Sequence, residues 1–409
     1  MEAGKTVQGA TRLAFDAVEG VTNIVEGMYR NISSFSMPFG PEPEGGARGI
    51  AGVVHEVVRQ SNGQIRDAVD RALGLMAPLI DKVDEQVPPH PNRQAAIAAL
   101  NGVCGDHLEQ TGNALALPMI FRRQGVQLGM DAESLREAYP DASGRILIAL
   151  HGLCMNDLWW TYRGHNHAEM LGQDGGYSVV YLRYNSGRHI STNGQELAVK
   201  LQALLDAWPV PVKSITLLGY SMGGLLSRSA LHYAQQQGLE WPRWVDKAVY
   251  LGTPHHGSAI ERGGNWFHAT FRVSPYTAPI SALGRIRSAG ITDLRYSNLL
   301  DEDWGEVEQF DTLGDLASKR ARDNRTPVPL PEGIVHHAIA ATLSPQPGAI
   351  IGKLLGDGVV HPSSGTGRHR EPERCLEFDA DKVRIFYDTG HLSLLDHPQV
   401  SVTLREWLL

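Results

Sequence analysis

The sequence predicts an α/β fold with a mostly parallel central sheet. From about residue 143 onward, short apolar segments typical of buried strands alternate with segments of helical spacing. One strand and one helix are joined by a short glycine-rich turn, Gly219 to Gly223. We therefore divide the chain into an all-helical N-terminal extension, residues 1–135, and an α/β domain, residues 143–409, with a cap inserted at about 258–331.

Composition places the chain among soluble globular proteins. Of its 409 residues, 42% are hydrophobic and 20% are charged, and the net charge of -8 disfavours a nucleic-acid partner. The three cysteines, Cys104, Cys154 and Cys375, form neither a disulfide framework nor a metal-binding spacing. The N-terminus lacks an apolar signal segment, and no run of about 18 apolar residues occurs, so we expect a cytoplasmic protein.

The N-terminal extension is predicted to be helical because its apolar residues recur every three or four positions. This spacing runs from Leu13 to Met28 and resumes from Ile50 to Ile80. Two roles remain open for these helices: packing against the α/β domain or a second copy of the chain, and peripheral docking on a lipid surface. Their polar faces mix acidic and basic residues, which disfavours anionic membranes.

The α/β domain is predicted to contain six strands, separated by helices. Helices are expected from Asp157, from Asn193 as N-cap, after the glycine-rich turn, and over Pro398–Leu409. The strands are expected at Arg145–Leu150, Ser178–Tyr184, Ile215–Leu218, Val245–Leu251, Ile334–Leu343 and Lys382–Asp388.

The turn Gly219-Tyr220-Ser221-Met222-Gly223 is a G-x-S-x-G sequence between a strand and a helix. In that context the serine lies on a sharp, strained turn that exposes its hydroxyl at the carboxyl edge of the sheet. A plain glycine-rich turn is the alternative interpretation. Ser221 is therefore a candidate nucleophile, provided that a base and an acid follow in the sequence.

The candidate base is His391, in the loop after the last predicted strand. The candidate acid is Asp357, between two glycines and after the preceding strand. Asp388 and Asp396 are nearer to His391 in the sequence, but one ends a strand and the other lies in the following helix. Serine, acid and base in this chain order match one of the orders in which hydrolases carry a Ser-His-Asp triad, that of the α/β-hydrolases.

Acyl transfer by a serine also requires N–H donors for the developing oxyanion. We expect these to be the backbone N–H groups of Met222, which follows the serine, and Leu153, which follows the first strand. The expected pocket residues are His151, which would mainly brace the Leu153 loop, Trp159, Trp160 and His256.

Several motifs together resemble the α/β-hydrolase lipases and esterases. They include His151-Gly152, Gly219 to Gly224, the run Gly252-Thr253-Pro254-His255-His256-Gly257-Ser258, Gly356 to Val360, and Gly390-His391. The Thr-Pro-His-His-Gly-Ser run is similar to that of bacterial triacylglycerol lipases and of the GPI-inositol deacylase type. The resemblance covers about residues 145–409 and implies a serine carboxylic-ester hydrolase with a small-molecule or lipid ester substrate.

Alternatives within and outside this class remain open. One is a hydrolase of a lipid or polyester surface, such as a phospholipase, thioesterase or depolymerase, and another is a non-catalytic scaffold with a hydrolase-like fold. No cofactor is expected. No metal site is expected either, because neighbouring histidines on a strand, such as His336 and His337, point to opposite faces. Acyl-chain length and oligomeric state do not follow from the sequence.

Overall fold

The computed structural model describes residues 91–258, 288–304, 323, 325–346 and 356–409. The predicted helices of residues 1–90 and most of the predicted cap lie outside these residues. All described residues from 95 onward belong to one compact unit.

An eight-stranded sheet forms the centre of this unit, in the order β2-β1-β4-β3-β5-β6-β7-β8. Strands β3 to β8 pair in parallel, whereas β1 is antiparallel to both β2 and β4. The strands are β1 Ile120–Arg123, β2 Val126–Gln127, β3 Arg145–Leu150, β4 Ser178–Arg183, β5 Ser214–Tyr220, β6 Val245–Leu251, β7 Val335–Ala341 and β8 Val383–Phe386. The fold class expected from the sequence is confirmed.

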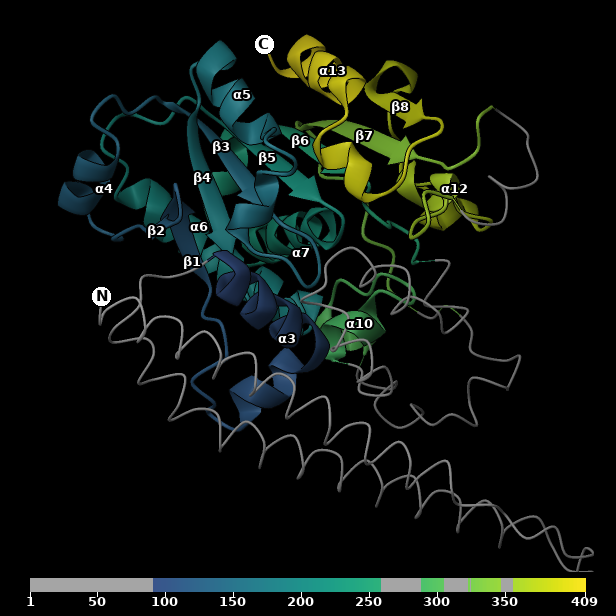
Figure 1. Cartoon of the computed structure of the whole chain (residues 1–409), viewed down its shortest axis with the longest axis horizontal. Coiled ribbons are helices and arrows are strands. Elements are labelled where there is room, and N and C mark those ends of the chain that lie inside the picture. The colour runs from purple at the N-terminus through teal and green to yellow at the C-terminus, as the bar shows by residue number, and fades with distance from the viewer. Residues whose placement is uncertain (1–90, 259–287, 305–322, 324, 347–355) are drawn as a thin grey trace, which may run out of the picture. The chain divides into compact units, whose positions relative to one another are not determined.

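Helices cover both faces of the sheet: α5 and α13 lie on one face, and α6 and α7 on the other (Figure 1). The connection from β3 to β4 runs in one direction along the sheet, and the connection from β4 runs back past β3 to β5. Because such crossovers are right-handed, their helices lie on opposite faces of the sheet. The helices are α3 Pro91–Gln110, α4 Ala132–Ala138, α5 His167–Gly175, α6 Ile190–Asp206, α7 Met222–Gln236, α10 Ala289–Asp293, α12 Pro362–Gly365 and α13 Pro398–Leu408. Short 3-10 turns lie at Asp157–Trp160, Trp241–Trp244, Asp301–Asp303, Pro372–Arg374, Ala380–Lys382 and Leu392–Leu395.

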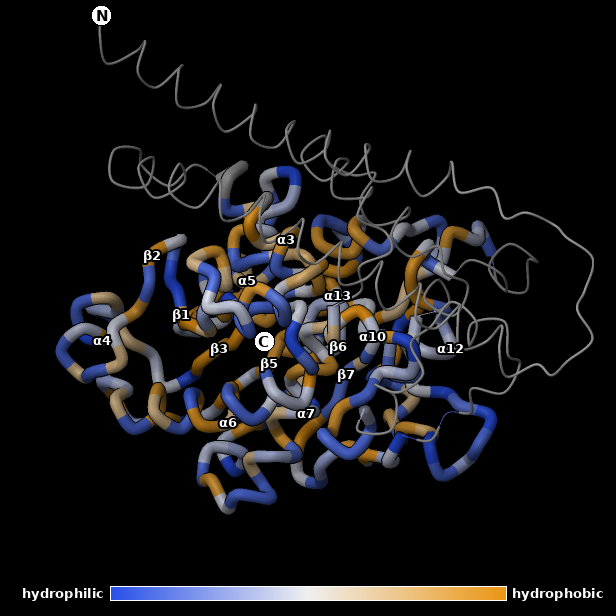
Figure 2. Tube along the Cα trace, turned by 90° about the horizontal axis from the view of Figure 1, so that it is seen from below, coloured by the Kyte–Doolittle hydropathy of each residue, from blue (hydrophilic) through white to orange (hydrophobic). Residues whose placement is uncertain are grey.

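The central strands are mostly apolar because both of their faces are covered. Residues 146–150 of β3 and 215–220 of β5 are all buried, and Figure 2 shows hydrophobic residues along both strands. Local signals define several helix ends. Asn166 accepts hydrogen bonds from the Ala168 and Glu169 N–H groups at the start of α5, and Gly176 ends that helix at a positive φ of 64°.

The prediction that residues 1–135 are all helical is wrong near its end. β1 and β2 lie within this range and extend the sheet beyond β4. β1 was missed because Ile120-Phe121-Arg122-Arg123 contains only two apolar residues, and it becomes a strand by pairing with β4.

The predicted helix start at Asn193 is also wrong. α6 begins at Ile190, and the Asp293 carboxylate accepts a 2.8 Å hydrogen bond from the Ile190 N–H. Asn193 lies inside the helix, where its side chain donates to the Asn185 carbonyl at 2.9 Å.

Among the described residues, no helix is long and apolar enough to cross a bilayer.

Candidate active site

Ser221 lies in a strained turn between β5 and α7. Its φ and ψ are 53° and -121°, a backbone conformation that non-glycine residues rarely adopt. The turn is held in place because the Ser221 N–H donates to the Leu251 carbonyl at the end of β6, at 2.8 Å. The predicted strand, turn and helix around the serine are therefore present.

Three glycines allow the close packing on which this turn depends. A Cβ on Gly219 would lie 2.5 Å from Gly224 Cα, and one on Gly223 would lie 2.1 Å from the Leu150 carbonyl oxygen. A Cβ on Gly224 would lie 2.0 Å from Thr253 Oγ1, in the loop after β6. Any larger residue at these positions would push the serine turn away from the ends of β3 and β6.

His391 and Asp357 form a buried pair at the same edge of the sheet. His391 Nδ1 lies 2.7 Å from Asp357 Oδ2, and the His391 N–H donates to the Asp357 carbonyl at 3.0 Å. The second carboxylate oxygen of Asp357 accepts from the N–H groups of Val359 and Val360, at 2.9 and 2.7 Å. With Nδ1–H donating to the carboxylate, Nε2 carries the imidazole lone pair, and it has no hydrogen-bond partner among the described residues.

Short contacts connect this pair to the serine turn. The Tyr220 hydroxyl, one residue before Ser221, donates to the His391 carbonyl at 3.2 Å, and the two rings lie 5.1 Å apart. A Cβ on Gly252 would lie 3.0 Å from His391 Cε1, and Gly252 directly follows Leu251, whose carbonyl binds Ser221. The structure thus brings the three candidate residues to one end of the sheet, although no direct hydrogen bond joins Ser221 to His391.

Asp388 and Asp396 make other contacts. Asp388 has a positive φ of 51°, and its N–H donates to the Ser344 carbonyl. The Asp396 carboxylate lies 3.6 Å from the Arg163 guanidinium. The carboxylate that contacts the His391 imidazole is that of Asp357.

The loop after β3 lies directly beside Ser221. A Cβ on Gly152 would lie 3.1 Å from Ser221 Cβ. Neither the Leu153 nor the Met222 N–H donates to a carbonyl in the turns and loops of the described chain, and Met222 is the first residue of α7, where N–H groups lack partners within the helix. β3 and β5 are adjacent parallel strands, so Leu153 and Met222, which follow them, lie at the same edge of the sheet.

His151 contacts both this loop and Tyr184, the residue after β4. Its ring stacks on Tyr184 at 4.3 Å, Nδ1 lies 2.8 Å from the Gly152 carbonyl, and the Tyr184 hydroxyl donates to the His151 carbonyl. Complete burial lowers the pKa of His151 to about 4, so the ring is neutral at pH 7. A neutral, fully enclosed imidazole holds the loop and leaves proton transfer to another group.

The other expected pocket residues contact the protein itself. Trp160 packs in the core, and Trp159 lies 6.4 Å from Tyr162, ring to ring. His256 Nδ1 lies 2.7 Å from an Arg325 guanidinium nitrogen, and burial lowers the pKa of His256 to about 3. Their contact with a substrate stays a prediction.

The run that contains His256 connects α7 to the Asp357 loop. Thr253 packs against Gly224, and the Ser258 hydroxyl donates to the Val359 carbonyl at 2.7 Å. The Val359 N–H in turn donates to the Asp357 carboxylate, so this run is connected to the candidate acid through Val359.

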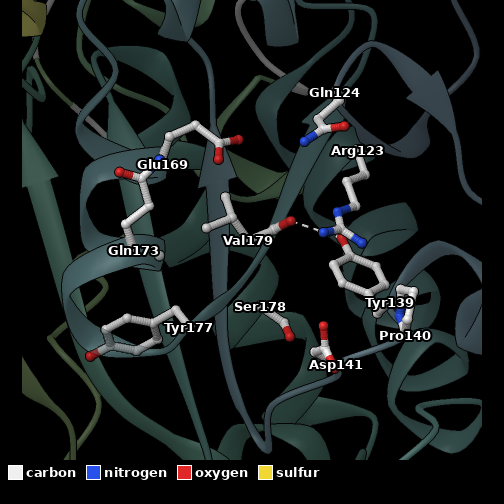
Figure 3. A pocket seen from close by; sticks show the side chains of 11 residues that line it. Arg123, Gln124, Tyr139, Pro140, Asp141, Glu169, Gln173, Tyr177, Ser178 and Val179 are labelled. Atoms are coloured by element: carbon white, nitrogen blue, oxygen red, sulfur yellow. Dashed lines mark hydrogen bonds between the residues drawn. The ribbon is translucent and has the colours of Figure 1, made fainter.

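A solvent-accessible hollow of about 230 Å³ lies at the opposite edge of the sheet (Figure 3). It is bordered by the start of β4 at Ser178 and Val179, by Arg123 stacked 4.3 Å above the Tyr139 ring, and by Glu169. Ser221 follows the end of the parallel strand β5, so this hollow is separate from the candidate triad.

Sequence reasoning missed the residues that hold the His391 turn. Besides Tyr220, His167 Nε2 lies 2.9 Å from the carbonyl oxygen of Leu394, in the 3-10 turn after His391. His167 is separated from Leu394 by 227 positions, so only the fold could reveal this contact. Within the described residues, no three His, Cys, Asp or Glu side chains are grouped to hold a metal ion.

Residues 162–313 match the family of PGAP1-like alpha/beta domains. A comparison with curated protein sequences gives no match.

Three solved structures are similar in fold. The mature lipase BlEst2 from Bacillus licheniformis has 19% identity and a TM-score of 0.40, over 64% of this chain and 91% of that chain. RedJ has 16% identity and a TM-score of 0.37, over 65% and 89%. The esterase Pf2001 from Pyrococcus furiosus has 13% identity and a TM-score of 0.37, over 65% and 80%.

The family match and the observed architecture agree. The PGAP1-like region includes the strained Ser221 turn, and the mostly parallel sheet brings Asp357 and His391 to the same edge. The region from residue 162 to 313 is similar to PGAP1-like alpha/beta domains, and the described residues fold around a mostly parallel sheet.

Proposed function

We propose that the chain is a serine carboxylic-ester hydrolase with Ser221 as nucleophile, His391 as base and Asp357 as the orienting acid. The observation that supports this most strongly is the 2.7 Å contact between Asp357 and His391 Nδ1, which leaves Nε2 available next to a strained serine turn. A serine hydroxyl becomes an effective nucleophile only when such a base removes its proton.

In the proposed reaction, Ser221 Oγ attacks the ester carbonyl carbon while its proton passes to His391 Nε2. The Asp357 carboxylate stabilises the resulting imidazolium. The tetrahedral oxyanion accepts hydrogen bonds from the Leu153 and Met222 N–H groups. The intermediate collapses as His391 returns the proton to the departing alcohol, which leaves an acyl-enzyme that water hydrolyses by the same steps.

The experiment that tests this proposal is hydrolysis of p-nitrophenyl esters from acetate to palmitate by wild type and Ser221→Ala. We expect wild-type turnover to peak at one chain length, and the variant to lose several orders of magnitude in kcat. Ser227→Ala is a matched control, because it removes another buried hydroxyl of α7, which donates to the Gly224 carbonyl. Turnover retained in Ser221→Ala would refute the assignment.

A lipid or polyester surface is a second candidate substrate, favoured by two exposed side chains near the pair. Leu343 and Tyr387 follow β7 and β8 and are 41% and 37% exposed. The methyl groups of Leu343 would lie 3.8 and 3.7 Å from a Cβ on Gly358 and on Gly390, the neighbours of Asp357 and His391. Faster hydrolysis of emulsified than of dissolved esters would favour this substrate class, and equal rates would exclude it.

A further inference from the structure

Helix α3 lies in direct contact with the loop after β3. A Cβ on Gly102 of α3 would lie 2.1 Å from Cys154 Sγ, 2.7 Å from Cys154 Cα and 2.8 Å from Cys154 N. Two of these atoms belong to the backbone, so a side chain at position 102 would force the helix or the loop to move. Cys154 directly follows Leu153, the proposed oxyanion donor.

The contact continues along α3 onto the segment after β4. A Cβ on Gly105 would lie 1.8 Å from Asn185 Oδ1, and one on Gly187 would lie 2.0 Å from the Asn101 carbonyl oxygen. The Asn185 amide donates to the Gly105 carbonyl at 2.8 Å. We call residues 101–105, 153–154 and 185–187 the α3 seam.

Hydrogen bonds join the α3 seam to neighbouring segments of the chain. The Cys154 N–H donates to Ser186 Oγ at 3.0 Å, and the Ser288 hydroxyl donates to the Gly102 carbonyl at 2.6 Å. The Ala289 N–H donates to the Asp106 carboxylate at 2.9 Å. Residues 288 and 289 belong to the segment predicted as the cap, so α3, the loop and this segment are joined together.

The backbone at the seam is not in a relaxed conformation. Cys154 has a positive φ of 61°, and Cys104 interrupts α3 with φ and ψ of -141° and 25°. A non-glycine residue keeps a positive φ only where surrounding contacts impose it. Gly102 and Ser186 both contact Cys154, the residue directly after Leu153, so they hold the loop next to the Leu153 N–H.

We propose that α3 is a positioning element for the oxyanion loop, with Gly102 as its contact point. The inference rests on the proposed function, since it assigns α3 a role through the Leu153 N–H. The last helix of the predicted N-terminal extension is then part of the catalytic unit, where its small residues let it approach the loop closely enough to hold it.

The test is Gly102→Ala in the full chain. An oxyanion donor displaced by about 1 Å lowers kcat by about 100-fold, because the donor acts on charge that develops only in the transition state. We therefore expect a large fall in kcat for a p-nitrophenyl ester with little change in KM. The inhibition constant of an alkyl trifluoromethyl ketone, whose adduct requires the oxyanion donors, should rise in parallel.

Gly144→Ala is the matched control. Gly144 directly precedes β3, at the edge of the sheet opposite to Ser221. A Cβ at this position would lie 2.5 Å from the Pro211 carbonyl oxygen. We expect a comparable fall in Tm with near-normal kcat. An unchanged kcat in Gly102→Ala, or equal losses in both variants, would overturn the inference.

Hydrogen–deuterium exchange of residues 151–156 separates this inference from the proposed function. Faster exchange in Gly102→Ala than in Gly144→Ala supports positioning of the loop by α3, even if wild type hydrolyses none of the esters. Equal exchange in the two variants overturns it, whatever the activity.

Discussion

Asp357→Asn tests the candidate triad most directly, because it keeps the shape of the acid and removes its charge. In the native protein, one carboxylate oxygen accepts the two backbone N–H groups of Val359 and Val360, and the other faces His391 Nδ1. An asparagine can keep the backbone bonds through its single oxygen, so its NH2 group then faces the imidazole. The imidazole must accept at Nδ1 and carry its proton on Nε2, where it cannot take the proton of Ser221.

The expected loss of kcat has two causes, the wrong tautomer of His391 and the missing negative charge at position 357. A carboxylate in hydrogen-bond contact stabilises the imidazolium of the transition state by on the order of 4 kcal/mol at an effective dielectric constant near 20. That energy alone corresponds to about 10³-fold in rate, and the wrong tautomer adds to it, so we expect kcat to fall by between about 10³- and 10⁴-fold.

The assay is the initial rate of p-nitrophenyl ester hydrolysis, with circular dichroism to check folding. Asp388→Asn is the matched control, since asparagine tolerates the positive φ of 51° at that position and Asp388 does not contact the imidazole of His391. A fall of less than tenfold in Asp357→Asn, or an equal fall in both variants, would refute the role of Asp357.

Two further predictions concern the supports of the site and the pH dependence of stability. Tyr220→Phe removes the 3.2 Å hydrogen bond to the His391 carbonyl and should cost about 1 kcal/mol, lowering kcat about fivefold at unchanged KM; an unchanged kcat would show that the hydroxyl does not position the base. Burial lowers the pKa of both His151 and His167 to about 4, so between pH 6.5 and 4 the unfolded chain binds more protons than the folded protein. The free energy of unfolding should therefore fall as the pH drops from 7 to 5, by on the order of 2 kcal/mol for each histidine. Urea titrations at the two pH values measure this, and a loss in His167→Gln as large as in wild type would contradict it.

Sequence patterns alone predicted most of the sheet and the order of the candidate triad. Strands β3, β4 and β5 are runs of consecutive, mostly apolar residues that are buried on both faces, as in Arg145–Leu150. The glycines around Ser221 likewise act within one short turn, so a local pattern is enough to locate it. Asp357 was preferred to Asp388 because it lies between two glycines in a loop after one predicted strand, whereas Asp388 ends the last predicted strand.

Other features depend on contacts between distant segments, and no local pattern could reveal them. β1 is a strand because it pairs with β4, and α6 starts at Ile190 because Asp293, 103 residues away, accepts its N–H. The same holds for α3, whose small residues look like an ordinary helix in the sequence but meet Cys154 and Asn185 in the fold. The sequence by itself determined the parallel part of the sheet and the choice of candidate residues, since both depend on neighbouring residues. Only the tertiary structure decided what holds that site in place, because those supports are hydrogen bonds and close packing between segments far apart in the chain.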